Sequence, residues 1–198
     1  RNDIKNIDVL EDILNIIPSS VGSLTNPNKL SDAFKLMKKQ NIALNTIKQY
    51  LDYCIDSFLI RKAYRYDVKG KEFLKTQGKY YIVDTGLRNQ RLGYRNSDRG
   101  YVLENVVFFE LLRRGYKVSI GKVGEKEIDF IATKSDNKKY IQVTESLKDE
   151  RTRERELAPL QATKDHFEKI VLTTDVLFTG TTEDGIKIIN LIDWLLKE

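Results

Sequence analysis

The sequence predicts an α/β protein of two domains, with helices and a β-hairpin over residues 1–83 and a mixed sheet flanked by helices over residues 84–198. Two observations lead to this prediction. Apolar residues near the N-terminus recur at spacings of three and four, as in amphipathic helices, whereas the second half contains runs with strand character. The charge is also uneven, because residues 1–83 carry 14 basic and 9 acidic side chains while residues 84–198 carry 20 of each.

Three helices are expected in the first domain, over residues 3–17, 32–39 and 46–57. Pro18 ends the first of them, and Ser31 can cap the second. The apolar side chains at helical spacing are the expected core of this domain, namely Ile7, Leu10, Leu14, Ile17, Phe34, Leu36, Met37, Ile47, Tyr50, Leu51 and Cys54.

Two strands, 58–65 and 79–83, follow the third helix and are joined by a polar turn. Residues 61–79 hold seven basic and two acidic side chains, which indicates contact with a phosphate backbone or, alternatively, a solvated hairpin. Helix, short helix, turn, helix and basic hairpin is the order of a winged helix-turn-helix. In that motif the third helix lies in the DNA major groove and the hairpin, the wing, lies along the phosphates. Protein-docking modules can have the same order of elements.

Eight residues of this domain are candidates for DNA contact. At the exposed start of the third helix, four side chains have the length and polarity to reach base edges, namely Asn45, Thr46, Lys48 and Gln49. Around the hairpin, four basic side chains are candidates for phosphate contact, namely Arg61, Lys69, Lys71 and Lys75.

The second domain is organised around residues 127–146, which read as two strands joined by a polar turn. Asp129 lies early in the first strand. Gln142 and Thr144 share one face of the second strand, and Glu145 is expected on the opposite face, because strand side chains alternate with period two.

A largely apolar helix over residues 100–114 precedes these strands. Its Glu104 stands among apolar residues, where a carboxylate needs a partner or a cation. Four arginines before this helix could hold phosphate or pair with acids: Arg88, Arg91, Arg95 and Arg99. The other expected elements are strands over 116–123, 170–174 and 185–190, a helical segment over 148–167 and a short helix over 191–196.

Composition excludes several classes of protein. With 40% apolar and 32% charged residues the chain is typical of soluble globular proteins, and neither a signal peptide nor a membrane span is recognisable. One cysteine and one histidine, Cys54 and His166, exclude an internal disulfide and the usual zinc sites. These features predict a cytoplasmic protein. Because the sequence begins with Arg1, we expect a piece of a longer chain.

The whole chain resembles the C-terminal part of an archaeal and bacterial family of AAA-type P-loop ATPases, and its second domain resembles the PD-(D/E)xK, or restriction-endonuclease-like, superfamily. The resemblance is carried by segments spread along the sequence, namely Thr25-Asn26-Pro27, Asn45-Thr46-Ile47, Tyr50-Leu51, 63–71, 79–89, Gly100, Glu104-Asn105, 127–130, Ile141-Gln142-Val143, 153–157 and Pro159-Leu160.

This resemblance implies a nuclease-like site in which Glu104 and Asp129 match two Mg²⁺ ligands. Gln142 stands where the third carboxylate belongs and Thr144 where the catalytic lysine belongs, so the site is expected to be degenerate. An amide is a poor ligand for a hard dication, and threonine supplies no charge against the phosphate. No P-loop is present, so ATP is expected in an N-terminal domain of the same chain, and this fragment holds no cofactor except possible Mg²⁺ at Glu104 and Asp129.

Three functions remain open from the sequence. The chain is a DNA-binding, regulatory C-terminal region of an ATPase whose nuclease-like domain lacks catalysis, a Mg²⁺-dependent DNA endonuclease, or a protein-docking module of an ATPase assembly. DNA and the N-terminal ATPase domain are the expected partners, a homo-oligomer is a further possibility, and no membrane is involved.

Overall fold

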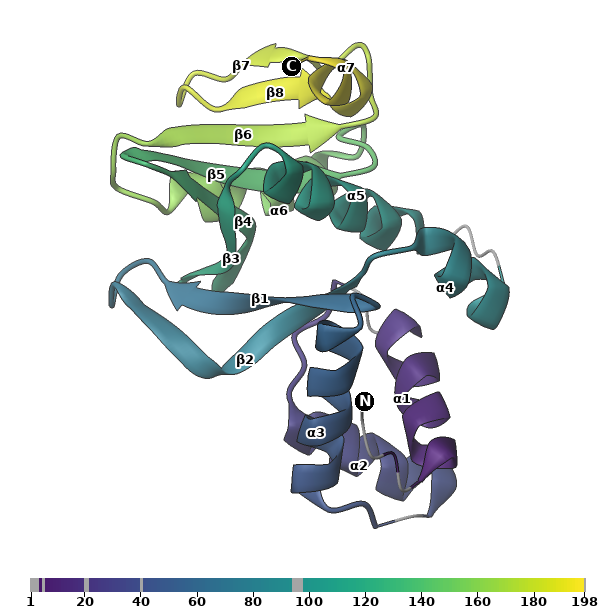
Figure 1. Cartoon of the computed structure of the whole chain (residues 1–198). Coiled ribbons are helices and arrows are strands. Elements are labelled where there is room, and N and C mark those ends of the chain that lie inside the picture. Colours follow the sequence, from purple (N-terminus) through teal and green to yellow (C-terminus); the bar gives the residue numbers. More distant parts are fainter. Residues whose placement is uncertain (1–3, 5, 20–21, 40, 94–97, 198) are drawn as a thin grey trace. The chain divides into compact units, whose positions relative to one another are not determined.

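The computed structural model describes residues 4, 6–19, 22–39, 41–93 and 98–197 (Figure 1). The chain divides into two compact units. The first comprises Arg1–Ala63 and Thr76–Arg95, and the second comprises Tyr64–Lys75 and Asn96–Glu198. This division differs from the predicted boundary between residues 83 and 84, because the tip of the hairpin groups with the second unit and the segment after residue 83 groups with the first.

The first unit contains four helices within the described ranges: α1 (Ile7–Ser19), α2 (Pro27–Lys38), α3 (Leu44–Asp56) and α4 (Thr85–Leu92). The side chain of Asn26 caps α2 by accepting from the backbone nitrogen of Lys29 at 2.8 Å, and Pro27 occupies the first turn. The sequence did not predict α4. Its start was encoded by Asp84, whose Oδ1 accepts from the backbone nitrogen of Gly86 at 2.7 Å.

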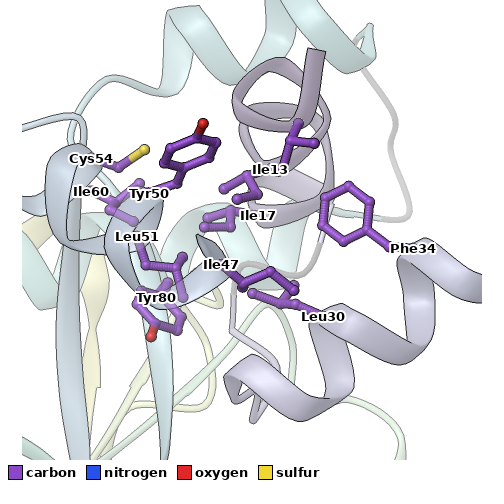
Figure 2. Packing of buried hydrophobic residues seen from close by; sticks show 11 residues of the cluster. Ile13, Ile17, Leu30, Phe34, Ile47, Tyr50, Leu51, Cys54, Ile60 and Tyr80 are labelled. Carbon is purple, nitrogen blue, oxygen red and sulfur yellow. The ribbon is translucent and has the colours of Figure 1, made fainter. Parts of the chain in front are cut away.

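The core of the first unit joins α1, α2 and α3 with the start of β1 (Ile60–Asp67) and with β2 (Glu72–Ile82). Figure 2 shows its buried side chains, among them Ile13, Ile17, Leu30, Phe34, Ile47, Tyr50, Leu51, Cys54, Ile60 and Tyr80. The predicted buried stripe of the third helix is therefore confirmed. Two core predictions were wrong, since Ile7 is 66% exposed and Leu36 is 84% exposed. Both occupy the outer faces of their helices. The side chain of Met37 lies outside the description.

The strands of the hairpin also belong to a larger sheet. β1 pairs in parallel with β3 (Lys117–Val123), with Arg65 opposite Ile120, and the backbone nitrogen of Val68 donates to the carbonyl of Lys122 at 2.9 Å. Pairing with β3 satisfies backbone groups that an isolated hairpin would leave to water. The sequence could not indicate this contact, because the two strands are about fifty residues apart.

β1 and β2 thereby extend an eight-stranded mixed sheet whose strand order is β2-β1-β3-β4-β5-β6-β8-β7. Its other strands are β4 (Lys126–Lys134), β5 (Asn137–Thr144), β6 (Glu168–Thr173), β7 (Gly180–Thr181) and β8 (Lys187–Asn190). β4 pairs antiparallel with both β3 and β5, and β7 pairs antiparallel with β8, whereas β6 pairs in parallel with both β5 and β8. The predicted α/β class, with a mixed sheet flanked by helices, is confirmed.

Three helices pack on this sheet: α5 (Arg99–Arg113), α6 (Glu150–Gln161) and α7 (Leu191–Leu196). Phe108 of α5 contacts Phe130 of β4, with ring centroids 6.0 Å apart. A second cluster joins α6, through Leu157 and Leu160, to Tyr140 of β5 and to residues of β6 and β8. The central strands are consequently buried on both faces.

The helix predicted over residues 148–167 is shorter in the structure. α6 ends at Gln161, and Pro159 lies within its last turn. The hydroxyl of Thr163 donates to the carbonyl of Leu160 at 2.7 Å and closes this end. No helix in the described ranges is both long and apolar enough to span a membrane.

Candidate functional site

A cavity of about 440 Å³ opens at the carboxyl end of β5, in the second unit. The four residues predicted for a nuclease-like site all line it, although they come from three elements: Glu104 of α5, Asp129 of β4, and Gln142 and Thr144 of β5. Each of the four is between 7% and 9% exposed. The predicted helix and the period-two alternation of β5 are therefore sufficient to bring these side chains together.

A chain of hydrogen bonds links the floor of this cavity to α6. The backbone nitrogen of Asp129 donates to Oε1 of Gln142 at 3.3 Å, and the backbone nitrogen of Val143 donates to Oδ2 of Asp129 at 2.9 Å. Nε2 of Gln142 donates to Oε2 of Glu156 at 2.8 Å. The oxygen and the nitrogen of the Gln142 amide therefore both have partners in this one orientation. Asp129, Gln142 and Glu156 are all buried.

Glu156 is the residue that the sequence analysis missed. Its Oε1 accepts from Nη2 of Arg155 at 2.7 Å, and the Arg155 side chain is 73% exposed at the mouth of the cavity. The alternating charges around Glu156 suggested a solvated helix face. Its position four residues before the buried Leu160 was the available signal, because residues four apart share a helix face.

The residues that follow β5 form a wall of the cavity, and the position of Glu145 in this wall differs from the predicted one. Glu145 was expected on the opposite face from Gln142, yet it lines the cavity, because β5 ends at Thr144 and strand alternation stops there. Its carboxylate pairs with Nη1 of Arg99 at 3.1 Å. The backbone carbonyl of Glu145 also accepts from the hydroxyl of Thr174 at 2.6 Å, which fixes the chain at this point.

Ser146 continues this wall and is held by a buried acid. Oδ2 of Asp175 accepts from the Ser146 hydroxyl at 2.9 Å and from the backbone nitrogen of Leu147 at 2.7 Å. The side-chain nitrogen of Asn190 in turn donates to the backbone carbonyl of Asp175 at 3.2 Å. The cavity wall is therefore braced by Asp175, which follows β6, and by Asn190, the last residue of β8.

Several oxygens that line this cavity already accept hydrogen bonds. Oxygens of Asp129 and Gln142 already accept from backbone nitrogens, and both oxygens of Glu156 already accept from side chains. Among the residues that the structure describes, no group of three or more histidine, cysteine, aspartate or glutamate side chains is placed to hold a metal.

The residues proposed to read bases lie at the start of α3, in the first unit. Asn45, Lys48 and Gln49 are exposed, and Thr46 is half-buried. Thr46 and Gln49 line a hollow of about 550 Å³ together with residues from the start of α1. Nε2 of Gln49 donates to the hydroxyl of Tyr53 at 2.5 Å, which draws this side chain along the helix.

The basic residues of the hairpin are less uniformly exposed than the sequence suggests. Lys69 and Lys71 are exposed at the tip, and a tight turn fixes the tip because Oδ1 of Asp67 accepts from the backbone nitrogen of Lys69 at 3.0 Å. Arg61 is half-buried, and its guanidinium lies 4.9 Å from the ring centroid of Phe58. The side chain of Lys75 lies outside the description.

Three further basic residues of this segment do not face solvent freely. Lys79 is 2% exposed. Nη2 of Arg65 lies 3.8 Å from Oε2 of Glu127. Burial lowers the pKa of Lys62, and the nearby Asp52 opposes this shift. The exposed positive charge of the hairpin is therefore concentrated at Lys69 and Lys71 within the described residues.

Comparison with known proteins gives relatives for the whole chain. A family model described as "Domain of unknown function (DUF8612)" matches residues 1–98. No solved structure matches the chain significantly. The chain is 41% identical over 197 residues to an uncharacterized protein of Haemophilus influenzae, of which it covers 48%. It is 31% identical over 163 residues, or 79% of its length, to uncharacterized protein MJ1544 of Methanocaldococcus jannaschii, of which it covers 35%. The chain thus spans about half, or less, of the length of these curated relatives.

Proposed function

We propose that this chain is the nucleic-acid-binding, regulatory C-terminal region of an AAA-type ATPase, in which a winged helix precedes a restriction-endonuclease-like domain that lacks catalysis. The proposal rests mainly on one observation. Glu104, Asp129, Gln142 and Thr144, which come from α5, β4 and β5, line a single cavity. The nuclease resemblance implies a site at these four positions.

The chemistry of the cavity favours an inert site. Gln142 is neutral, and its amide is held between the backbone of Asp129 and the carboxylate of Glu156. Thr144 offers a hydroxyl, which donates to the carbonyl of Ser146 at 3.3 Å, where a nuclease would need a cation. Neither residue supplies the charge that metal-assisted phosphodiester cleavage requires.

The nucleic-acid part of the proposal is supported by exposed polar groups in two places. Asn45, Lys48 and Gln49 are exposed at the start of α3, and Lys69 and Lys71 are exposed at the hairpin tip. These side chains offer donors to base edges and positive charge to phosphates, respectively.

The test is a titration of duplex DNA by fluorescence anisotropy at several salt concentrations, together with a cleavage assay in Mg²⁺ and Mn²⁺. We expect salt-dependent binding and no cleavage. Lys69→Glu/Lys71→Glu should weaken binding to every duplex and flatten its salt dependence by about two phosphate contacts. The charge-matched control is Lys117→Glu/Lys164→Glu, since both of these lysines are exposed elsewhere in the second unit.

The preference of the protein for one DNA sequence over another tests the contribution of α3 separately from that of the β1–β2 hairpin. Thr46→Ala and Gln49→Ala should relax any preference between duplexes more than they lower non-specific affinity. Metal-dependent cleavage that disappears in both Glu104→Gln and Asp129→Asn would contradict the inert site and would favour the endonuclease alternative.

A protein-docking role for the first unit is a second candidate. It is favoured by the exposed face of α3, where Asp52 and Asp56 stand beside Lys48 and would oppose a phosphate backbone. The same titration distinguishes the two functions, because a docking module should bind no duplex in a salt-dependent way.

A further inference from the structure

The second unit has an acidic groove of about 670 Å³, which is lined by one face of α6, by β7 and by the turn that joins β7 to β8. The apolar part of its lining comes from the half-buried Ala158 and from Leu157, which is 9% exposed. Four acidic side chains, all exposed, surround this surface, namely Glu150, Glu154, Glu183 and Asp184. Arg153 is the one basic residue of the lining, which leaves the groove with an excess of negative charge.

Most of this negative charge is not compensated within the described chain. Asp184 accepts from Nε2 of Gln161 at 2.7 Å, but Glu150, Glu154 and Glu183 form no ion pair with any residue that the structure describes. A concave surface with apolar lining and uncompensated acids fits a ligand that combines positive charge with an apolar side chain.

Such a combination is exposed at the end of α2 in the first unit. Leu36 is 84% exposed, and the exposed Lys35 and Lys39 flank it. Lys35 lies in the last turn of α2, and Lys39 caps the end of the helix in a left-handed backbone conformation, with φ of 53°. Neither lysine forms an ion pair with a described residue, whereas Lys38 pairs with Asp12 at 3.1 Å.

Among the helices in the described ranges, α2 alone places an exposed large apolar side chain between two exposed lysines. The surface formed by Lys35, Leu36 and Lys39, hereafter the α2 knob, is thus complementary to the groove in both charge and polarity. We propose that the groove of one copy of the chain binds the α2 knob of a second copy, with Leu36 against Leu157 and Ala158 and the lysines beside the acids.

This contact is heterologous, because it joins two different surfaces of the same chain. Each copy keeps one free knob and one free groove after the first contact forms, so association continues to a ring or to an open chain rather than stopping at a symmetric dimer. Its ionic part should weaken with salt, since the charges on both sides are exposed.

The experiment is sedimentation velocity of the intact chain over a range of concentrations, in about 50 mM and about 500 mM NaCl. We expect concentration-dependent association at low salt that weakens at high salt. Lys35→Glu/Lys39→Glu, with a reversed knob, and Glu154→Lys/Glu183→Lys, with a reversed groove, should each weaken association at least about tenfold.

Mixing the two variants gives the sharpest result. An equimolar mixture pairs an acidic knob with a basic groove and a basic knob with an acidic groove, so it should associate although neither variant does so alone. The charge-matched control Lys117→Glu/Lys164→Glu should associate like the unaltered chain. A single-chain mass at every concentration, or variants that each associate undiminished, would overturn the proposal, as would failure of the mixture to associate.

Discussion

Nε2 of Gln142 donates to Oε2 of Glu156 across 2.8 Å, and this contact ties β5 to α6 beneath the cavity. Gln142 is the only one of the two that can donate, while Glu156 also accepts from Arg155. The amide is therefore the donor of this hydrogen bond and the carboxylate is the acceptor. Substitutions that remove the donor, or that exchange donor and acceptor, test how much this hydrogen bond contributes to stability.

Gln142→Glu should destabilise the protein by about 3 kcal/mol at neutral pH, because two carboxylates would then face each other in a buried site. The loss should shrink as the pH falls, because protonation of one of the two carboxylates removes the repulsion between them. It should also shrink if added Mg²⁺ bridges the pair. Urea denaturation with and without Mg²⁺ measures both effects.

The matched control for this prediction is Gln142→Glu/Glu156→Gln, which exchanges the two groups. An amide at position 156 can donate to a carboxylate at position 142, and the new carboxylate can still accept from the backbone nitrogen of Asp129. The double variant should therefore recover most of the stability that Gln142→Glu loses. Simple additivity of the two single changes would show that the contact is not energetically coupled.

Arg114 is predicted to hold the C-terminal helix α7. Its Nη2 donates to the carbonyls of Trp194 at 2.6 Å and of Lys197 at 2.7 Å, and its guanidinium lies 4.2 Å from the Trp194 ring centroid. Arg114→Lys keeps the charge but loses the fork and the stacking plane, so it should cost about 2 kcal/mol. Because Trp194 is the only tryptophan, its fluorescence reports the change directly.

The expected signal is a red-shifted Trp194 emission in Arg114→Lys under native conditions. Arg113→Lys is the control, since Arg113 is 65% exposed and its bonds go to Glu110, on the same helix. An unchanged spectrum in Arg114→Lys would mean that α7 is held by its apolar contacts alone.

The sequence predicted the strands at the centre of the second unit, but it predicted neither the burial of Glu156 nor the pairing of β1 with β3. Local periodicity and one turn placed Gln142 and Thr144 on one face of a strand that follows the strand of Asp129. The resemblance to nucleases implied that these residues share a site. Glu156 could not be assigned, because the side that a helix buries depends on the sheet it meets. The pairing of β1 with β3 joins segments that are far apart in the sequence, and no residue pattern in either strand predicts it.

In the first unit, the sequence did not predict which apolar side chains are buried. Leu36 and Ile47 both lie at helical spacing among apolar residues, yet Leu36 is 84% exposed and Ile47 is fully buried. Periodicity finds the apolar face of a helix, but neighbouring helices decide how wide a part of that face they cover. Leu36 follows the buried Phe34 by two residues, which places it on the outer face of α2.

Glu110 should make stability sensitive to acid. A hydrogen bond from Arg113, together with Arg114, outweighs burial and lowers the pKa of Glu110 to about 2 from its ordinary value of 4.5. A lowered pKa in the folded state means that the stabilisation is complete above pH 4.5 and is lost as the pH falls toward 2. Glu110→Gln should flatten this part of the stability profile, which acid titration of the unfolding free energy measures.

A second carboxylate serves as the control for the Glu110→Gln prediction. Asp136 is exposed in the turn between β4 and β5, so Asp136→Asn should leave the slope between pH 4.5 and 2 unchanged. A Glu110→Gln variant with the same acid profile as the unaltered protein would show that the arginines do not stabilise the ionised form of Glu110.

Cys54 should report the opening of the first unit. It is the only thiol of the chain, it is 1% exposed in the core shown in Figure 2, and burial raises its pKa to about 11. Only a small fraction is thiolate at neutral pH, and no reagent reaches it in the closed core. Labelling by a disulfide reagent should therefore be at least about a thousandfold slower than in the unfolded chain.

Core and surface substitutions separate this mechanism from simple chemical inertness of Cys54. Ile47→Ala removes a fully buried side chain beside it, which should cost about 3 kcal/mol and accelerate labelling on the order of a hundredfold, because the labelled species is the opened unit. Leu36→Ala changes a side chain that is 84% exposed and should leave the rate unchanged. If Ile47→Ala labels no faster than the unaltered chain, opening of this core does not control access to Cys54.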